Sequence, residues 1–253
     1  DATLLGLLGG ADSNEEVGLY GAAFRLIEGT MFLSWAFVAA VFPWLSRHRS
    51  GSNGISLPRS YELGVKLLMV LLLPLACALV LLAPEIIDTI YGSDYEGSVV
   101  PLQLLGCIVV FYGINYFSSA VLTARDRPTR FTFIVAIVAI QNVAMNLILI
   151  PEHGAQGAAL TAAISGVLLA TLSVWQTTSL IGRVRITRTV IAPLCGLAAM
   201  VAIILLTSLG LILSLVVSGL AFLAVVVGIE ALLNPGDLGL VARALRLPLP
   251  SRA

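Results

Sequence analysis

The chain has 253 residues, of which 58% are hydrophobic and 11% are charged, and its formal net charge is zero. Soluble domains carry about 25% charged residues, so this composition predicts an all-α polytopic membrane protein rather than a soluble one. The neutral balance gives little support to nucleic-acid binding, and the sequence has no GxxxxGK[ST] phosphate loop that would indicate direct use of ATP.

Seven apolar runs are long enough to cross a hydrocarbon core of about 30 Å, which takes about 20 residues as a helix. The predicted spans are residues 16–46, 62–84, 98–124, 130–150, 157–182, 189–208 and 211–233. Residues 1–10 begin with an apolar run that lacks the basic start of a signal peptide. We interpret this run as the second half of a truncated span, so the chain is expected to be a fragment.

The charges between the spans alternate in sign. Twelve of the fourteen Lys and Arg residues fall in four breaks: Arg47, Arg49 and Arg59; Arg125, Arg127 and Arg130; Arg183, Arg185 and Arg188; Arg243, Arg246 and Arg252. The other breaks carry the acids Asp12, Glu15, Glu16, Glu85, Asp88, Asp94, Glu96 and Glu152. By the positive-inside rule, this alternation predicts a multi-pass protein of the cytoplasmic (inner) membrane with a cytoplasmic C-terminus. The alternative is that charges simply collect at helix ends.

The cysteines and histidines give no sign of catalysis or of a bound cofactor. Cys77, Cys107 and Cys195 occur singly inside apolar spans, without CxxC spacing, and are expected to be packing residues. His48 and His153 are about 100 residues apart and form no recognisable zinc or catalytic pattern. The sequence therefore does not predict an enzyme.

Two charged residues lie deep in the first complete span. Counting about 1.5 Å per residue from Glu15 places Arg25 roughly 15 Å into the membrane, with Glu28 one turn further on the same face. Burying a charge at this depth costs about 2.5 to 3.5 kcal/mol even on a lenient scale. One interpretation is an internal ion pair that lets the helix insert. The favoured one is a cavity wall, where the Arg25 guanidinium could bind a phosphate through two parallel hydrogen bonds.

A stripe of amides lies on the span 130–150, formed by Gln141, Asn142 and Asn146. Asn142 and Asn146 are four residues apart and share a helix face. Such amides commonly bond neighbouring helices, which is the default interpretation, and a cavity or cation site is the alternative. By contrast, residues 189–233 are expected to lack a polar stripe and to face lipid or an acyl chain.

Several stretches form a specific series of motifs: VGLYGAAFRLIE at 17–28, FPWLSR at 42–47, YGSDY at 91–95, PLQLL at 101–105, NLILIP at 146–151, and the residues Gly154, Gly157, Ala158 and Ala159. This series resembles polysaccharide flippases of the multidrug/oligosaccharidyl-lipid/polysaccharide exporter superfamily. Their order and spacing match across residues 1–182, whereas the last two spans match only by hydropathy. The chain thus resembles the C-terminal half of such a flippase.

The resemblance implies a MATE-like transporter with two six-helix lobes around a cavity, to which some members add two C-terminal helices. Residues 1–182 would be the C-terminal lobe, 183–234 the additional helix pair and 235–253 a cytoplasmic tail. The implied activity is alternating-access translocation of undecaprenyl-diphosphate-linked oligosaccharide, and the implied partners are that substrate, membrane lipids and the missing N-terminal lobe. A cation-coupled multidrug or lipid-precursor exporter and a non-transporting membrane scaffold are the alternatives.

The resemblance also implies site residues. Arg25 matches a cationic cavity position, and the candidate substrate-cavity residues are Arg25, Glu28, Gln141, Asn142 and Asn146. Some relatives bind a sodium ion in this lobe, and the candidate ligands here are Asp1, Asn142, Asn146 and Thr161. The family pattern expects the threonine at Ala162, and a shift of one residue turns a side chain by about 100°. The coupling ion is therefore left open between sodium and a proton.

Overall fold

The computed structural model describes residues 1–8, 13–47, 56–125, 128–207, 210–234 and 236. Several residues of the sequence-based topology argument lie outside this set: Asp12, His48, Arg49, Arg127, Arg243, Arg246 and Arg252, together with the side chains of Arg47 and Arg130 and most of the tail 235–253. The statements below concern the described residues only.

The described residues are almost entirely helical and include no β-strand. The elements are α1 (Ala2–Leu8), α2 (Ser13–Arg47), α3 (Leu57–Leu81), α4 (Ala83–Tyr91), the 3-10 helix η2 (Ser93–Ser98), α5 (Val99–Ala124), α6 (Pro128–Ile181), α7 (Ile186–Leu206) and α8 (Leu211–Leu233). Six of these helical segments are long and apolar enough to cross a membrane. The predicted polytopic helical bundle is confirmed.

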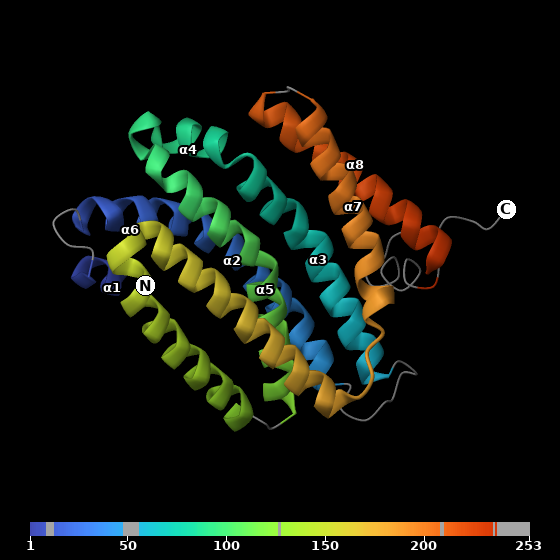
Figure 1. Ribbon diagram of the computed structural model, residues 1–253. Helices are drawn as coiled ribbons and strands as arrows, with labels where there is room; N and C mark the ends of the chain where they lie inside the picture. Colours follow the sequence, from blue (N-terminus) through green and yellow to red (C-terminus); the bar gives the residue numbers. More distant parts are fainter. Residues whose placement is uncertain (9–12, 48–55, 126–127, 208–209, 235, 237–253) are drawn as a thin grey trace. The chain divides into compact units, whose positions relative to one another are not determined.

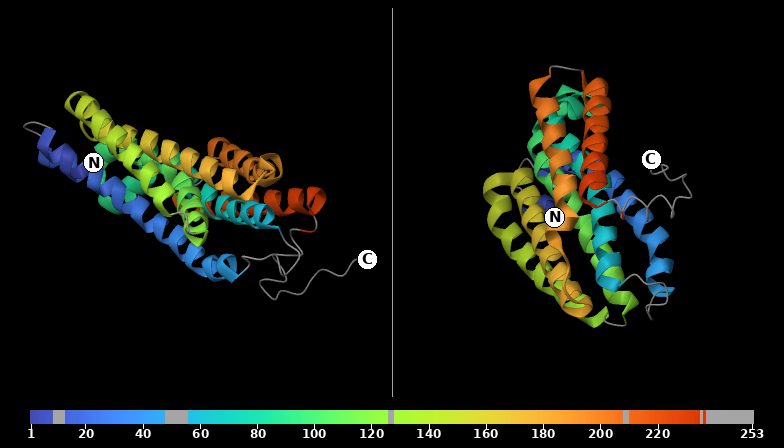
Figure 2. Two further views of the ribbon diagram at one scale, coloured as in Figure 1. Left: turned by 90° about the horizontal axis from the view of Figure 1, so that it is seen from below. Right: turned by 90° about the vertical axis from the view of Figure 1, so that its right-hand side faces the viewer.

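The element α6 is two helices joined at a break. Gly154 has φ 51° and ψ −130°, a conformation outside the helical region that favours glycine. The two arms, 128–153 and 155–181, are each of about 26 residues, enough to span about 30 Å. Figure 1 shows them running side by side from the bend, and both views of Figure 2 agree. They correspond to the separate spans predicted at 130–150 and 157–182.

The chain forms two compact units, Asp1–Val184 and Arg185–Ala253. In the first unit, α5 packs against α2, α3 and α6. The fully buried ring of Phe117 stacks on Tyr61 with their centroids 5.6 Å apart, and the Tyr61 hydroxyl lies 2.6 Å from Ser118 Oγ. One turn earlier on α5, Ser173 Oγ of α6 donates to Asn115 Oδ1 at 2.7 Å. These buried hydrogen bonds tie α3, α5 and α6 together.

The successive helices of the first unit alternate in direction, so its two ends differ in charge. One end, here named the acidic end, carries Glu15, Glu16, Glu85, Asp88, Asp94, Glu96 and Glu152. The opposite end, named the arginine end, carries Arg59, Arg125 and Arg183. The bend of α6, the start of α2, and α4 all belong to the acidic end (Figure 1).

The second unit is a hairpin of α7 and α8. A Cβ added at Gly196 of α7 would lie 2.7 Å from Val226 Cγ2, so the two helices approach closely there. The face of α8 that contains Val226 also buries Ser214, Ser218 and Glu230. The expectation that residues 189–233 lack a polar stripe is therefore wrong. The two serines and one acid are spaced at whole multiples of four residues, and the aliphatic residues between them mask the pattern.

Candidate functional site

A chain of polar contacts joins α1 to both arms of α6. Asn146 Nδ2 donates to Asp1 Oδ1 at 2.6 Å and to Asn142 Oδ1 at 3.0 Å. Asn142 Nδ2 in turn donates to Ser165 Oγ on the second arm at 3.1 Å, and Ser165 Oγ donates to Gln141 Oε1 at 3.1 Å. Four of the residues named from the sequence thus come together, with Ser165 as the link between the arms.

The same contacts fix where Thr161 lies. Asn142 and Ser165 lie at nearly equal distances along the chain before and after Gly154. Their hydrogen bond therefore shows that the two arms run antiparallel, and it fixes which residues of the arms face each other. Moving one helical turn toward the bend on each arm places Asn146 opposite Thr161. Both residues are fully buried. Thr161 lies four residues before Ser165 and shares its helix face, and at this position the face carries a hydroxyl oxygen.

Two oxygens at this level have no hydrogen-bond partner among the described residues, Asn146 Oδ1 and Thr161 Oγ1. The orientation of the Asn146 amide is set by chemistry, because its nitrogen can donate to the Asp1 carboxylate and its oxygen cannot. A buried oxygen without a donor costs about 1 to 3 kcal/mol. Carboxylate, amide and hydroxyl oxygens such as those of Asp1, Asn146 and Thr161 are the ligand types that hard cations such as sodium prefer.

Arg25 and Glu28 lie elsewhere, on the exposed face of α2. No ion pair joins these two described side chains, so the interpretation as an internal ion pair is not what the structure shows. Further along the same face are Phe32 and Trp35, which are 63% and 54% exposed, with ring centroids 6.1 Å apart. The opposite face of α2 packs into the bundle, where Ile27 is fully buried. The candidate residues therefore fall into two groups, one half-buried or buried at the arms of α6 and one on an open helix face.

Two further residues of the acidic end were not singled out from the sequence. The Tyr20 hydroxyl donates to Asp1 Oδ2 at 3.4 Å, and Glu16 Oε2 accepts a hydrogen bond from the Ala155 main-chain N–H at 2.5 Å. The Glu16 contact joins residues 139 positions apart in the sequence. No local pattern predicts such a contact, although an acid at the start of one helix and a glycine break in another were both visible.

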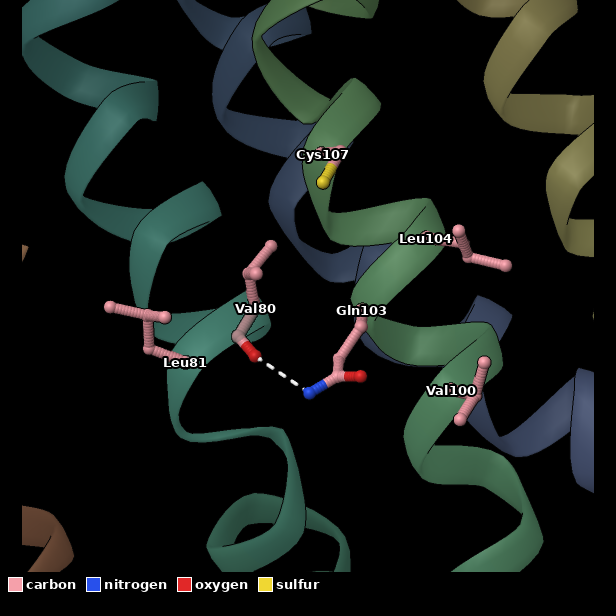
Figure 3. A pocket seen from close by; sticks show the side chains of 6 residues that line it. All are labelled: Val80, Leu81, Val100, Gln103, Leu104 and Cys107. Carbon is pink, nitrogen blue, oxygen red and sulfur yellow. Dashed lines mark hydrogen bonds between the residues drawn. The ribbon is translucent and has the colours of Figure 1, made fainter.

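A separate pocket of about 310 Å³ lies between the ends of α3 and α5 (Figure 3). It is lined by Val80, Leu81, Val100, Gln103, Leu104 and Cys107. Pro84 has no N–H to donate to the carbonyl four residues earlier, and Gln103 Nε2 donates to that carbonyl, Val80 O, at 3.2 Å. The glutamine thus satisfies a main-chain acceptor that proline leaves open.

Comparison with known proteins relates this chain to membrane flippases. The family described as "Lipid II flippase MurJ" matches residues 29–227. The "Probable low-salt glycan biosynthesis flippase Agl15" of Haloferax volcanii is 24% identical over 153 residues, which are 60% of this chain and 32% of that protein. The "Probable flippase AglR" of the same organism is 28% identical over 172 residues, which are 66% of this chain and 36% of that protein. The chain thus spans about a third of the length of these relatives.

Proposed function

This chain belongs to the lipid II flippase MurJ family, and we propose that it forms the C-terminal part of a flippase for an oligosaccharide linked to an isoprenoid diphosphate. Such a protein moves its substrate between membrane leaflets by alternating access and changes no covalent bond. The relatives are about three times as long as the segment matched here, which supports an N-terminal lobe that completes the substrate cavity.

The observation that carries this proposal is Arg25 on the open face of a membrane-spanning helix. An arginine in a span normally faces a bundle interior or a watery cavity. A diphosphate offers the paired oxygens that a guanidinium binds through two parallel hydrogen bonds. The positive charge of Arg25 would also repel organic cations, which makes a multidrug exporter the weaker alternative.

The proposed orientation places the arginine end in the cytoplasm. The Arg-rich breaks in the sequence favour this assignment by the positive-inside rule, and they also favour a cytoplasmic C-terminus in the cytoplasmic membrane. The acidic end, with the bend of α6, would then face outward. The diphosphate would enter from the arginine end and leave toward the acidic end.

We further propose that a sodium ion couples to transport through Asp1, Asn142, Asn146 and Thr161. The proposal is supported by the buried oxygens of Asn146 and Thr161, which lack hydrogen-bond partners, and by the Asp1 carboxylate, which accepts a hydrogen bond from Asn146. When bound, a monovalent cation supplies a positive charge that offsets this carboxylate. Asn142 holds the amide of Asn146 in place and connects it through Ser165 to the second arm.

The first experiment measures the leaflet distribution of the lipid-linked oligosaccharide in a gene-deletion strain. Wild type, Arg25→Ala and the double variant Arg25→Ala/Glu28→Ala are restored separately. Arg125→Ala removes an arginine from the arginine end and serves as the matched control. We expect accumulation in the cytoplasmic leaflet that wild type and the control relieve and the Arg25 variants do not, with normal membrane insertion of all proteins. Full activity of the double variant would refute the role of this face.

A second experiment tests the cation site by thermal unfolding in sodium or potassium at equal ionic strength. A ligand at 100 times its Kd stabilises the folded state by about 2.7 kcal/mol. Sodium should raise the melting temperature of wild type and of the control Asn14→Ala, and it should not raise that of Asn146→Ala. An equal sodium response in Asn146→Ala would exclude the proposed site.

A further inference from the structure

Glu16 contacts the break in α6 from another helix. Its Oε2 accepts the Ala155 N–H at 2.5 Å, and a Cβ built on Gly154 would lie 2.5 Å from the same oxygen. Ala155 itself is only 2% exposed. The carboxylate of α2 is therefore packed directly against the first residues of the second arm.

This contact meets a definite chemical need. Gly154 leaves the helical conformation, so the second arm starts anew and its first N–H groups have no partner within the helix. A carboxylate at a helix N-terminus is favoured by the helix dipole, and hydrogen bonds to an ionised acceptor are about twice as strong as neutral ones. Glu16 thus acts as an N-terminal cap supplied by a different helix.

The cap joins the two elements that carry the proposed sites. Thr161 lies about 9 Å along the second arm from Ala155, and Arg25 lies about 13.5 Å along α2 from Glu16. A displacement of the second arm that accompanies cation binding would therefore be passed to the helix of Arg25 through the charged hydrogen bond of Glu16, alongside the weaker link from the Tyr20 hydroxyl of α2 to Asp1 Oδ2.

Other polar contacts hold the same end of α2. Ser98 Oγ donates to Leu19 O at 2.8 Å, and the Tyr91 hydroxyl donates to Ala22 O at 3.2 Å. These contacts come from η2 and α4, so they fix α2 to the acidic end without touching α6. Glu16 is thus the contact in this group that reaches the second arm.

We propose that Glu16 is a positioning residue that couples occupancy of the site at Asp1, Asn146 and Thr161 to the affinity of the α2 face for diphosphate. This inference rests on the proposed function. It requires no contact between Glu16 and either ligand. The proposal predicts that Glu16 variants change how much one ligand alters the affinity for the other, and that the affinity for each ligand alone is nearly unchanged.

The experiment titrates the purified full-length protein with undecaprenyl diphosphate, with and without saturating sodium. The ratio of the two dissociation constants is the coupling factor, and a sodium titration with and without the diphosphate must give the same factor. Allosteric coupling factors are typically about 5 to 150, so we expect at least about fivefold for wild type. Glu15→Ala, which removes the neighbouring exposed acid, is the matched control and should keep the wild-type factor.

In Glu16→Ala, the coupling factor should fall by at least about threefold, while sodium affinity and the sodium-free diphosphate affinity stay within about threefold of wild type. Glu16→Gln keeps an acceptor for the Ala155 N–H but not its charge, so its factor should fall by at least about twofold. If Glu16→Ala does not fold, the coupling factor measured for Glu16→Gln tests the proposal instead.

The failures can be told apart. Wild-type protein that binds neither ligand would overturn the proposed function and this inference with it. Wild-type protein that binds both ligands independently would overturn only the inference. A wild-type coupling factor in Glu16→Ala or Glu16→Gln would overturn it as well, and so would the loss of sodium binding in Glu16→Ala, because Glu16 would then act on the site itself.

Discussion

Gly154→Ala tests the physical account of the bend in α6. The φ of 51° with ψ −130° lies in a region that a residue with a Cβ occupies at a cost of about 1 to 3 kcal/mol. The added methyl would also lie 2.5 Å from Glu16 Oε2 and displace the carboxylate from the Ala155 N–H. A hydrogen bond to a charged group is worth about 1.5 to 3 kcal/mol. The two effects together predict a loss of about 2.5 to 6 kcal/mol in unfolding free energy.

The assay is equilibrium unfolding in mixed detergent micelles, followed by tryptophan fluorescence, for a double-mutant cycle with Glu16→Ala. With the carboxylate already absent, Gly154→Ala should cost only the backbone strain, so the cycle should give a coupling of about 1.5 to 3 kcal/mol. Gly18→Ala is the control, because a Cβ there meets no atom within 4 Å and alanine is the better helix former. A Gly154→Ala cost below about 1 kcal/mol, or an equal cost in both backgrounds, would refute the reasoning.

Three other substitutions can be tested by the same unfolding measurement. Gly64→Ala places a methyl against the buried ring of Phe117 and should cost about 1 to 3 kcal/mol; an unchanged stability would mean that α3 and α5 can separate freely. Gln103→Leu leaves the Val80 carbonyl without its donor and should cost about 1 to 2 kcal/mol, whereas a gain would show that filling the pocket outweighs the lost bond. Gly196→Ala should destabilise the α7–α8 hairpin by about 1 to 3 kcal/mol, and a stabilisation from helix propensity alone would contradict the close approach seen there.

Hydropathy was sufficient to predict the membrane-spanning helices, because the length of an apolar run is a local property. It also separated the two arms of α6, which the structure joins at Gly154. The amide stripe was visible as a four-residue repeat, but the sequence analysis did not identify its partner Ser165. Its hydrogen bond depends on how two helices face each other, and local periodicity does not contain that information.

The position of Thr161 also could not be judged from the periodicity of a single helix. A family register placed the expected ligand at Ala162, whereas the hydrogen bond between Asn142 and Ser165 fixes the pairing of the arms, and Thr161 lies one turn from Ser165 toward the bend. The break at Gly154 determines which residues of the two arms face each other, and a spacing counted along one helix does not contain that information. The contact of Glu16 with Ala155 was missed for a similar reason, because it depends on tertiary packing across 139 positions.

The distance along the chain between Glu16 and Ala155 has a consequence for how the protein is made. At roughly 5 to 20 residues per second, the bend is synthesised on the order of 10 to 30 s after the acid that caps it. During that interval α3, α4, α5 and the first arm are produced, and the Glu16 carboxylate has to rely on water or on lipid headgroups until the bend emerges. Docking of the α6 hairpin onto α2 would then be a late step of assembly, and variants of Glu16 should leave a nascent protein that inserts normally but stays sensitive to proteolysis at the bend.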